Sequence, residues 1–156
     1  MIKEVRITTL EELMPLISEQ KYRPELDRNR SPYVYRGMPN TDFRMITSLR
    51  RNCKTLEKRL EPSILNNFAK YAVIEDATVT HSVWRQMIMG QHYGLPTRLL
   101  DWTHSALVGL HFAVNEDNLE TMADHDCMVW RIDMSELNAL LPEEYRSVLR
   151  ENKAEV

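Results

Sequence analysis

The sequence predicts an α+β fold in which a small, mostly antiparallel sheet is packed by several helices. Short runs of β-branched and aromatic residues, typical of strands, stand near the N-terminus, at residues 33–37 and near the C-terminus. Between them, apolar residues recur at helical spacing. With 156 residues, no internal repeat and no linker-like stretch, the chain is predicted to be a single domain over residues 1–156.

The N-terminal residues predict a strand, a helix and a loop. "IKEVRI" (2–7) alternates apolar and polar residues, which indicates a short strand. Thr9 and Glu12 have the spacing of a capping box, and leucines at helical spacing follow, so we expect a helix over 10–19. The polar stretch 23–32, which contains two prolines, is predicted to be a connecting loop.

A second strand is predicted at "YVYRG" (33–37), where aromatic and β-branched residues precede Gly37, which we expect to end the strand. Residues 38–55 have no clean period and are predicted to run irregularly over the surface. This stretch carries four cations, which are Arg44, Arg50, Arg51 and Lys54.

Two amphipathic helices are predicted in the middle of the chain. The first has Pro62 in its first turn, where the missing N–H costs nothing. Its inner face is predicted to be Ile64, Leu65, Phe68, Tyr71 and Ala72. The second is predicted to be capped by Thr80 and ended by Gly94, before Pro96. Its inner face is predicted to be Val83, Trp84, Met87, Ile88 and Gln91.

A short, strongly apolar helix is predicted at "HSALVGLHFAV", capped by Thr103 or Asp101. Its small residues would let it lie close to a neighbouring element, and they are Ala106, Gly109 and Ala113. A polar loop over 116–126 and a buried strand over 127–133 are expected next, and the remaining residues predict one or two short helices and a frayed tail.

Three strands are few for a complete sheet. Either edge strands lie unrecognised in residues 38–55, or the fold is incomplete at the C-terminus and is finished by something outside this chain.

Composition narrows the functional classes. The formal net charge of −3 disfavours a protein that coats nucleic acid, although it leaves room for a local basic patch. No apolar run reaches the roughly 18 residues of a membrane span, and the N-terminus lacks the apolar core of a signal peptide. Cys53 and Cys127 are read as two reduced thiols, so we expect a cytoplasmic protein.

Two stretches concentrate side chains that bind ligands. Arg36 at the end of a strand presents a planar fork suited to phosphate or carboxylate, and Gly37 lets a ligand approach the backbone. The corner "QHYGLPTRLLDWT" (91–103) combines an amide, an imidazole, hydroxyls, a guanidinium, a carboxylate and an indole. The ligand-binding candidates are Arg36, Gly37, Gln91, His92, Tyr93, Thr97, Arg98, Asp101, Trp102 and Thr103.

A structural role for the same residues is a strong alternative. An Arg98–Asp101 ion pair could simply brace the corner, Trp102 could belong to the core, and Arg36 could pair with an acid at the core's edge. No metal site is predicted, because His104 and His111 are seven residues apart, which is not the spacing of a metal-binding pair on a helix.

The motifs "YVYRG", "MITSLRR", "QHYGLPTRLLDWTHSALVGLHFAV" and "VWRID" resemble those of the FRG domain family, which is named for its Phe/Tyr-Arg-Gly motif. The resemblance covers residues 1 to about 140, so the chain is identified as a single FRG domain, and the resemblance implies that it is shortened at its C-terminus relative to the family.

A more distant resemblance is to ADP-ribosyltransferases, whose site also begins with an aromatic-Arg-Gly on a strand. It implies that Arg36 holds a pyrophosphate or ribose of NAD. Tyr93 or Trp102 would then stack on the nicotinamide, and Thr97 or Thr103 would orient it. Those enzymes carry a catalytic Glu on a late strand, and no such strand follows "VWRID" here, so the resemblance leaves open whether this chain is an enzyme.

These observations support three functional hypotheses. The first is a nucleotide- or NAD-binding cleft formed by Arg36 and the 91–103 corner, acting in a bacterial or phage defence or toxin context. The second is a non-catalytic interaction or sensor domain that binds a phosphorylated or acidic partner, with an anion surface made of Arg36, Arg44, Arg50, Arg51 and Arg98. The third is a domain that processes nucleic acid.

Overall fold

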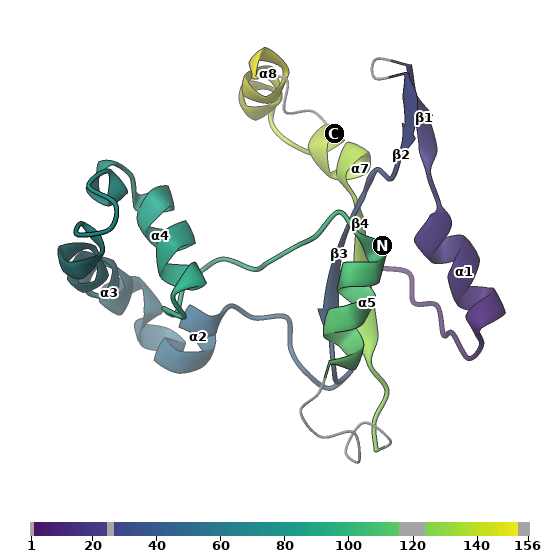
Figure 1. Cartoon of the computed structure of the whole chain (residues 1–156), viewed down its shortest axis with the longest axis horizontal. Helices are drawn as coiled ribbons and strands as arrows, with labels where there is room; N and C mark the ends of the chain where they lie inside the picture. The colour runs from purple at the N-terminus through teal and green to yellow at the C-terminus, as the bar shows by residue number, and fades with distance from the viewer. Residues whose placement is uncertain (1, 25–26, 116–123, 153–156) are drawn as a thin grey trace. The chain divides into compact units, whose positions relative to one another are not determined.

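The strand predicted at "YVYRG" is β3 (Tyr33–Met38) of a computed structural model (Figure 1). The residues that the structure describes are 2–24, 27–115 and 124–152. The chain gathers into two compact units, a sheet unit (Met1–Phe43 with Trp102–Val156) and a helical unit (Arg44–Asp101). The α+β class is confirmed. The single-domain organisation stays a prediction.

β3 pairs antiparallel with β4 (Met128–Asp133), so the strand predicted at 127–133 is confirmed. Tyr33 stands opposite Asp133, and Met38 stands opposite Met128. β4 is less buried than its apolar sequence predicts, since Val129 is 37% exposed. The reason is that, within the described residues, β4 has a partner strand on only one side.

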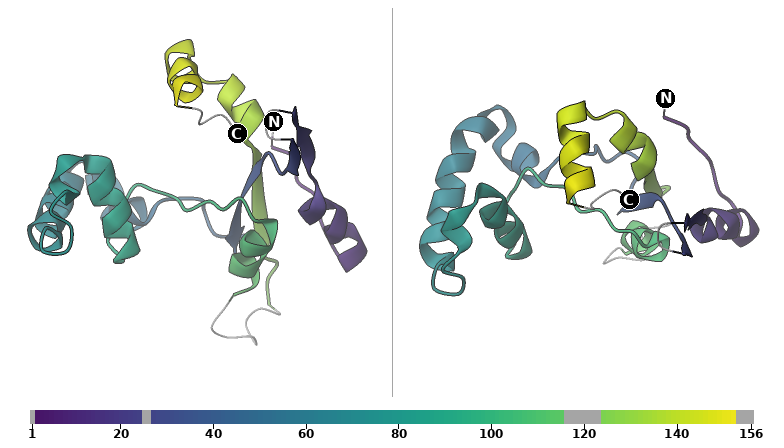
Figure 2. Two further views of the ribbon diagram at one scale, coloured as in Figure 1. Left: turned by 45° about the horizontal axis from the view of Figure 1, so that its top comes forward. Right: turned by 90° about the horizontal axis from the view of Figure 1, so that it is seen from above.

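α5 (Ala106–Val114) lies along β3 (Figures 1 and 2). Its small residues face the sheet. Ala106, Gly109 and Ala113 are buried, as predicted. A Cβ on Gly37 would stand 2.0 Å from the carbonyl oxygen of Gly109 and 2.4 Å from the amide nitrogen of Ala113. Gly37 therefore lies inside β3, and the prediction that it ends the strand is wrong, because its role is to admit the helix backbone.

The cap of α5 is also different from the prediction. Ser105 is the N-cap, and its hydroxyl accepts a hydrogen bond from the amide of Val108. Neither Thr103 nor Asp101 takes this position. Thr103 instead forms an antiparallel bridge with Tyr35, through N–H···O=C bonds of 2.7 and 2.9 Å, which place it as a third strand-like element beside β3.

α1 (Leu10–Ser18) begins at the predicted capping box. The Thr9 hydroxyl accepts from the Glu12 amide at 3.3 Å, and the Glu12 carboxylate accepts from the Thr9 amide at 3.3 Å. The strand predicted over residues 2–7 is wrong, because all six residues are exposed and pair with no strand in the described part of the chain. Alternation alone cannot hold a strand that has no hydrogen-bonded neighbour.

A hairpin replaces the loop that was predicted for 23–32. β1 (Lys21–Arg23) pairs antiparallel with β2 (Arg28–Arg30). In the turn, Asp27 adopts a φ of 49°, and its carboxylate accepts a 2.6 Å hydrogen bond from the Tyr22 hydroxyl. Asp is one of the few residue types that tolerate a positive φ, so Asp27 can form the turn where glycine is usual. Without a glycine the polar sequence showed no hairpin signal, and a loop was predicted instead.

The C-terminal helices are confirmed as α7 (Met134–Ala139) and α8 (Glu143–Glu151). The Asp133 carboxylate caps α7 by accepting from the amides of Ser135 and Glu136. Most of the polar loop predicted over 116–126 lies outside the described residues.

The helical unit consists of two longer helices together with shorter helical elements before and between them (Figure 1). They are α2 (Ser48–Cys53), the 3₁₀ turn η2 (Lys54–Leu56), α3 (Glu57–Ala72), the 3₁₀ turn η3 (Val79–His81) and α4 (Val83–His92). Both expectations for 38–55, an irregular run and unrecognised edge strands, are therefore wrong for its second half. Thr47 caps α2 through the Arg50 amide, and Leu49 buries its side chain, so the segment is helical despite lacking a period.

α3 begins at Glu57, five residues before Pro62, so Pro62 lies in the helix interior and not in its first turn. The buried residues of α3 are Glu61, Leu65, Ala69 and Ala72. Leu65 and Ala72 were predicted to face inward, but Tyr71 is 75% exposed. Ala69 and Ala72 pack with Val79, because small side chains let the chain of η3 come close.

The buried face of α4 is rotated from the predicted one. Thr80 lies in η3, and the N-cap of α4 is Ser82. The buried residues are Gln86, Met87 and Gly90. Of the predicted face, Met87 is buried, whereas Val83, Trp84 and Ile88 are exposed. The rotation follows from Gly90, against which the Leu95 side chain packs so closely that a Cβ would stand 2.8 Å from its Cδ2.

α4 ends at His92, and Gly94 follows its C-cap Tyr93 as the terminating glycine that was predicted. Gly94 has a φ of 80°, its amide donates to the Gln91 carbonyl at 3.0 Å, and the Leu95 amide donates to the Gly90 carbonyl at 2.8 Å. This pair of bonds is a Schellman motif, which turns the chain sharply into the corner.

Gly37→Ala is expected to lower the free energy of unfolding by about 3 kcal/mol, because the added Cβ overlaps backbone atoms that cannot rotate away. Gly94→Ala is the control, since nothing lies within 4 Å of its Cβ. It should cost only about 1 kcal/mol, for its positive φ. Urea denaturation measures both, and equal losses would contradict the close contact between β3 and α5.

Candidate functional site

Thr97 lies at the centre of the 91–103 corner and is 1% exposed. Its amide donates to the Ser48 hydroxyl at 3.1 Å, and its carbonyl accepts from the Leu49 amide at 3.0 Å. Its own hydroxyl donates to Gln91 Oε1 and accepts from the Leu99 amide. These bonds occupy its backbone and its side chain, so Thr97 ties the corner to α2.

Arg98 forms a two-bond ion pair with Glu61 of α3. Arg98 Nε donates to Glu61 Oε1 at 2.6 Å, and Arg98 Nη2 donates to Glu61 Oε2. Glu61 is only 5% exposed, whereas the Arg98 side chain is 60% exposed. Arg98 thus compensates the charge of a buried carboxylate. Asp101, by contrast, accepts a hydrogen bond from Gln91 Nε2.

The exposed end of the corner carries two aromatic side chains. The Tyr93 ring packs edge-on to His92, with ring centroids 5.4 Å apart, and lies 6.3 Å from the Phe68 ring. The Tyr93 hydroxyl donates to the Glu75 carboxylate, and this hydrogen bond raises the pKa of Tyr93. His92 and Tyr93 are both exposed, so either side chain can contact a ligand.

The remaining candidates belong to the sheet unit. Gly37 is packed under α5, Trp102 is half-buried, and Thr103 bridges to β3. Arg36 is half-buried on the face of β3 opposite α5, because side chains alternate along a strand and Gly37 faces the helix. The shared cleft between Arg36 and the corner stays a prediction.

Trp130 of β4 stands directly opposite Arg36 in the strand register, so the two side chains share a face of the sheet. The indole N–H of Trp130 is buried and finds no hydrogen-bond acceptor among the described residues. A buried donor without an acceptor is unusual in proteins, so this position requires an explanation.

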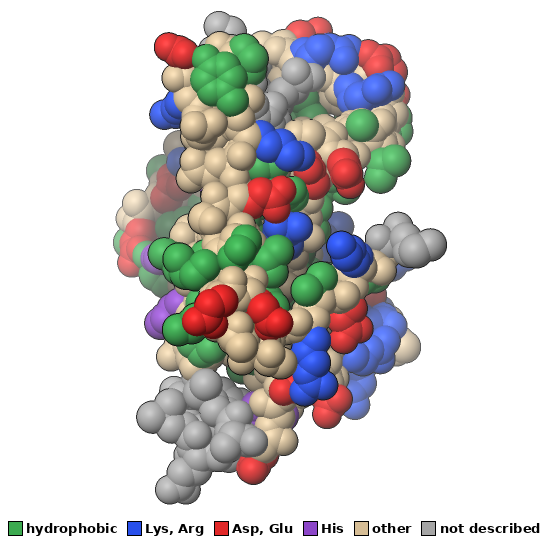
Figure 3. Space-filling model, turned by 90° about the vertical axis from the view of Figure 1, so that its right-hand side faces the viewer, with side chains coloured by type: hydrophobic (Ala, Val, Ile, Leu, Met, Phe, Trp, Pro, Cys, Tyr) green, Lys and Arg blue, Asp and Glu red, His purple; other side chains and the backbone are tan. Residues whose placement is uncertain are grey.

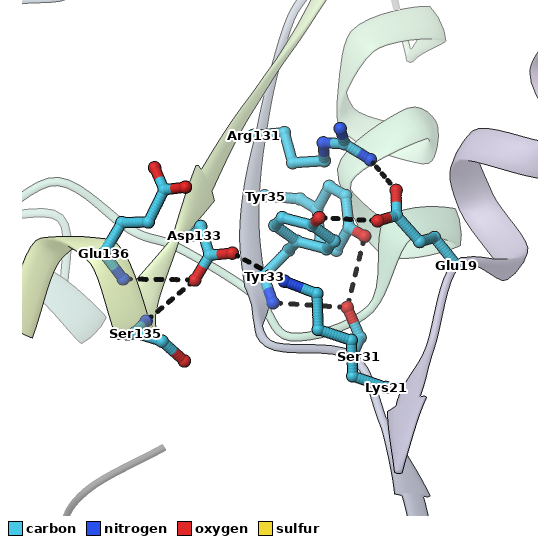
Figure 4. Close-up of polar contacts among 9 residues, drawn as sticks. All are labelled: Glu19, Lys21, Ser31, Tyr33, Tyr35, Arg131, Asp133, Ser135 and Glu136. Carbon is cyan, nitrogen blue, oxygen red and sulfur yellow. Dashed lines mark hydrogen bonds and ion pairs between the residues drawn. The ribbon is translucent and has the colours of Figure 1, made fainter.

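A cluster of charges surrounds Tyr33 in the sheet unit (Figure 4). The Tyr33 hydroxyl donates to Glu19 at 2.6 Å, and Arg131 pairs with the same carboxylate at 2.7 Å while lying over the Tyr33 ring. Lys21 pairs with Asp133 at 3.2 Å. Two cations face two carboxylates, so the cluster is neutral and holds α1, β1, β3 and β4 together.

The same balance of charge extends over the nearby surface. On the side of the molecule that bears α1 and the β1–β2 hairpin, acidic and basic side chains lie interspersed (Figure 3). Such a mixed surface gives no single-sign field that would attract a charged ligand.

The helical unit contrasts with this pattern, because it contains an open pocket of about 290 Å³ with a cationic lining. The lining residues are Arg44, Ile46, Arg50, Arg51, Lys54 and Thr55. Arg50 Nη1 donates to the Lys54 carbonyl at 3.1 Å and to Glu57 Oε1 at 2.9 Å. We call this the basic pocket.

The sequence placed Arg44, Arg50 and Arg51 in a candidate anion surface together with Arg36 and Arg98, but it predicted an irregular run for their segment and left Lys54 out of that surface. The signal that was missed is spacing, because positions 50, 51 and 54 stand at i, i+1 and i+4 around the end of α2. Arg44 precedes α2 in the non-helical residues 44–47, so no periodic pattern predicts that it joins them.

Comparison with known proteins identifies the family. The FRG domain family model matches residues 31–122. The chain belongs to the FRG domain family. No curated protein and no solved structure is detectably similar to this FRG domain. The likeness to ADP-ribosyltransferases therefore stays a prediction.

Three further findings apply to the described residues of the FRG domain. Cys53 and Cys127 are free thiols. No three His, Cys, Asp or Glu side chains gather there as a metal site would need. No helix in this part of the chain combines the length and the apolar character needed to cross a membrane.

Arg98→Met is expected to lower the free energy of unfolding by about 2 kcal/mol, because the buried Glu61 carboxylate loses its partner. In a Glu61→Gln background the same change should cost less than about 1 kcal/mol, since no charge is left unpaired. Urea denaturation at pH 7 measures both costs. If the two costs are equal, Arg98 has no structural role towards Glu61.

Stability at alkaline pH should depend on Tyr33. Its hydrogen bond to Glu19, followed by burial, raises the pKa of Tyr33 to about 12 from the ordinary 10.0. The folded state therefore keeps the phenol proton, and this contribution is complete below pH 10 and is lost between pH 10 and about 12. Urea unfolding from pH 8 to 12 should show wild type losing more stability than Tyr33→Phe across that interval. Parallel profiles would contradict the assignment.

Proposed function

We propose that this FRG domain is a non-catalytic interaction module that binds a phosphorylated or acidic partner through the basic pocket. The observation that carries the proposal is the concentration of four cations around one concave site. The chain as a whole has a net charge of −3, so this positive charge is local and is not a consequence of a basic composition.

Three of the four cations are available to an anion. Arg50 is paired with Glu57, whereas Arg44, Arg51 and Lys54 are exposed and pair with no carboxylate within the described residues. Guanidinium groups bind phosphate and carboxylate through two parallel hydrogen bonds, and an ammonium adds a point charge. A pocket with this lining favours an anionic group over any neutral one.

The lining supports binding in preference to catalysis. It contains no carboxylate, imidazole or thiol, which are the side chains that most often act as general acids, general bases or nucleophiles. The Thr55 hydroxyl has no such base beside it in the lining and serves best as a hydrogen-bond donor or acceptor.

NAD binding at Arg36 is a second candidate, supported by one observation. The buried indole N–H of Trp130, across β3–β4 from Arg36, is a donor that a ligand oxygen would satisfy. This second candidate requires the 91–103 corner to lie beside Arg36. A reaction on bound NAD would also require that arrangement.

Binding of a fluorescent phosphoserine peptide, followed by anisotropy, tests the first proposal. Arg44→Gln combined with Arg51→Gln should weaken binding at least about tenfold, because two charge-assisted contacts are lost. Lys70→Gln is the matched control, since Lys70 is exposed in the last turn of α3, about 20 Å along the helix from Glu57. It removes one positive charge from the same unit, against two in the double variant, and should bind as wild type does.

Three outcomes would count against the proposal. One is the absence of saturable binding by wild type, and another is equal binding by the double variant with an unchanged melting temperature. The third is that wild type binds NAD and releases nicotinamide, and that Arg36→Ala abolishes both, which transfers support to the second candidate. Retention of the double variant on single-stranded RNA would show that nucleic acid binds elsewhere.

A further inference from the structure

Lys54 has a backbone conformation that ordinarily belongs to glycine. Its φ is 52° and its ψ is −123°, and it stands where α2 ends and η2 begins. The other described non-glycine residue with positive φ is Asp27, a residue type that tolerates such a turn through local hydrogen bonds. A lysine has no such compensation, so its backbone is strained.

The backbone contacts of Lys54 do not explain why a lysine stands there. Its amide caps α2 by donating a hydrogen bond to the Arg50 carbonyl, and its carbonyl accepts a 3.1 Å hydrogen bond from Arg50 Nη1. A glycine would make both bonds without strain. Packing does not explain it either, because the side chain is exposed and pairs with no carboxylate in the described part of the chain.

What glycine would lack is the ammonium group, and Lys54 is one of the residues that line the basic pocket. The strained turn also orients its neighbour, because Arg50 donates both to the Lys54 carbonyl and to Glu57 at 2.9 Å. Strain that persists beside a concave charged site indicates that the side chain contributes something the fold itself does not require.

We propose that Lys54 is the specificity-determining residue of the basic pocket, and that the group it recognises is a phosphate monoester. This inference rests on the proposed function and adds the chemical class of the ligand. Lys54 stands at a position that favours glycine because its charge completes the set of cations that a dianion needs.

Charge supports a phosphate monoester over a carboxylate. Glu57 neutralises Arg50, which leaves the charges of Arg44, Arg51 and Lys54 in the pocket. A phosphate monoester carries a charge of about −1.5 to −2 at pH 7 and offers three acceptor oxygens, whereas a carboxylate carries −1 and offers two. Three cations around one group therefore match the monoester better.

Size supports the same conclusion. A volume of about 290 Å³ lies at the lower end of the range for ligand pockets. The site is open to solvent, so it admits a head group while the rest of the ligand stays outside. Thr55 adds a hydroxyl that can donate to a phosphate oxygen.

Two substitutions separate charge from strain. Lys54→Gly removes both the ammonium and the strain, so it should raise the melting temperature by about 3 °C. The same variant should weaken binding of phenyl phosphate about five- to tenfold. Lys54→Gln keeps the strained backbone and should weaken binding equally without raising the melting temperature.

Ligand probes test the chemical class. Phenyl phosphate should bind wild type at least about tenfold more tightly than diphenyl phosphate or benzoate, which carry one charge each. Its affinity should rise between pH 5 and 7.5, because the dianion forms as pH passes the second phosphate pKa near 6. A phosphoserine peptide and adenosine monophosphate then identify which molecule carries the phosphate. Tighter binding of the peptide indicates a phosphorylated protein, and tighter binding of adenosine monophosphate indicates a nucleotide.

The outcomes distinguish this inference from the proposed function. If wild type binds phenyl phosphate and the Arg44/Arg51 double variant does not, but both Lys54 variants bind as wild type does, then the role of Lys54 is overturned and the pocket stands. If benzoate or diphenyl phosphate binds as tightly as phenyl phosphate, the monoester class is overturned. If wild type binds none of the probes, both proposals fail.

Discussion

The sheet unit depends on the contact of two backbones, where α5 rests on β3 with no side chain between them at Gly37. A two-stranded sheet is marginal in water unless a helix or further strands cover it. Here the cover comes from Ala106, Gly109 and Ala113, whose small size brings the helix against the strand. Tyr35 and Thr103 extend the sheet by one bridge, and the register between β3 and β4 then sets which residues share a face with Arg36.

The sequence predicted those features that local chemistry determines by itself. The capping box at Thr9, the glycine that ends α4 and the small residues of α5 are such cases, because each depends on neighbours a few positions away. Prediction from the sequence failed where a partner distant in the chain determines the local structure. Residues 2–7 alternate as a strand should, yet no neighbour pairs with them, and the face of α4 is turned by the packing of Leu95 on Gly90.

The candidate site shows the same division. The chemical variety of the 91–103 corner suggested a ligand. Instead, Thr97 forms hydrogen bonds with Ser48 and Leu49, and Arg98 pairs with the buried Glu61. The sequence named Arg44, Arg50 and Arg51 as part of an anion surface but did not predict their grouping with Lys54 in one pocket, because that grouping requires a short helix followed by a 3₁₀ turn. Density of polar residues along a chain therefore distinguishes poorly between a site and a well-braced turn.

Asp133 acts on two elements at once. One carboxylate oxygen accepts from the first amides of α7, and the other pairs with Lys21 in the hairpin. Separating the hairpin would release the orientation of that carboxylate, and unwinding the first turn of α7 would free it to move away from Lys21. The hairpin and the first turn of α7 are thus expected to open cooperatively, with solvent exchange of the Ser135 and Glu136 amide protons tracking the order of a segment more than a hundred residues earlier in the chain.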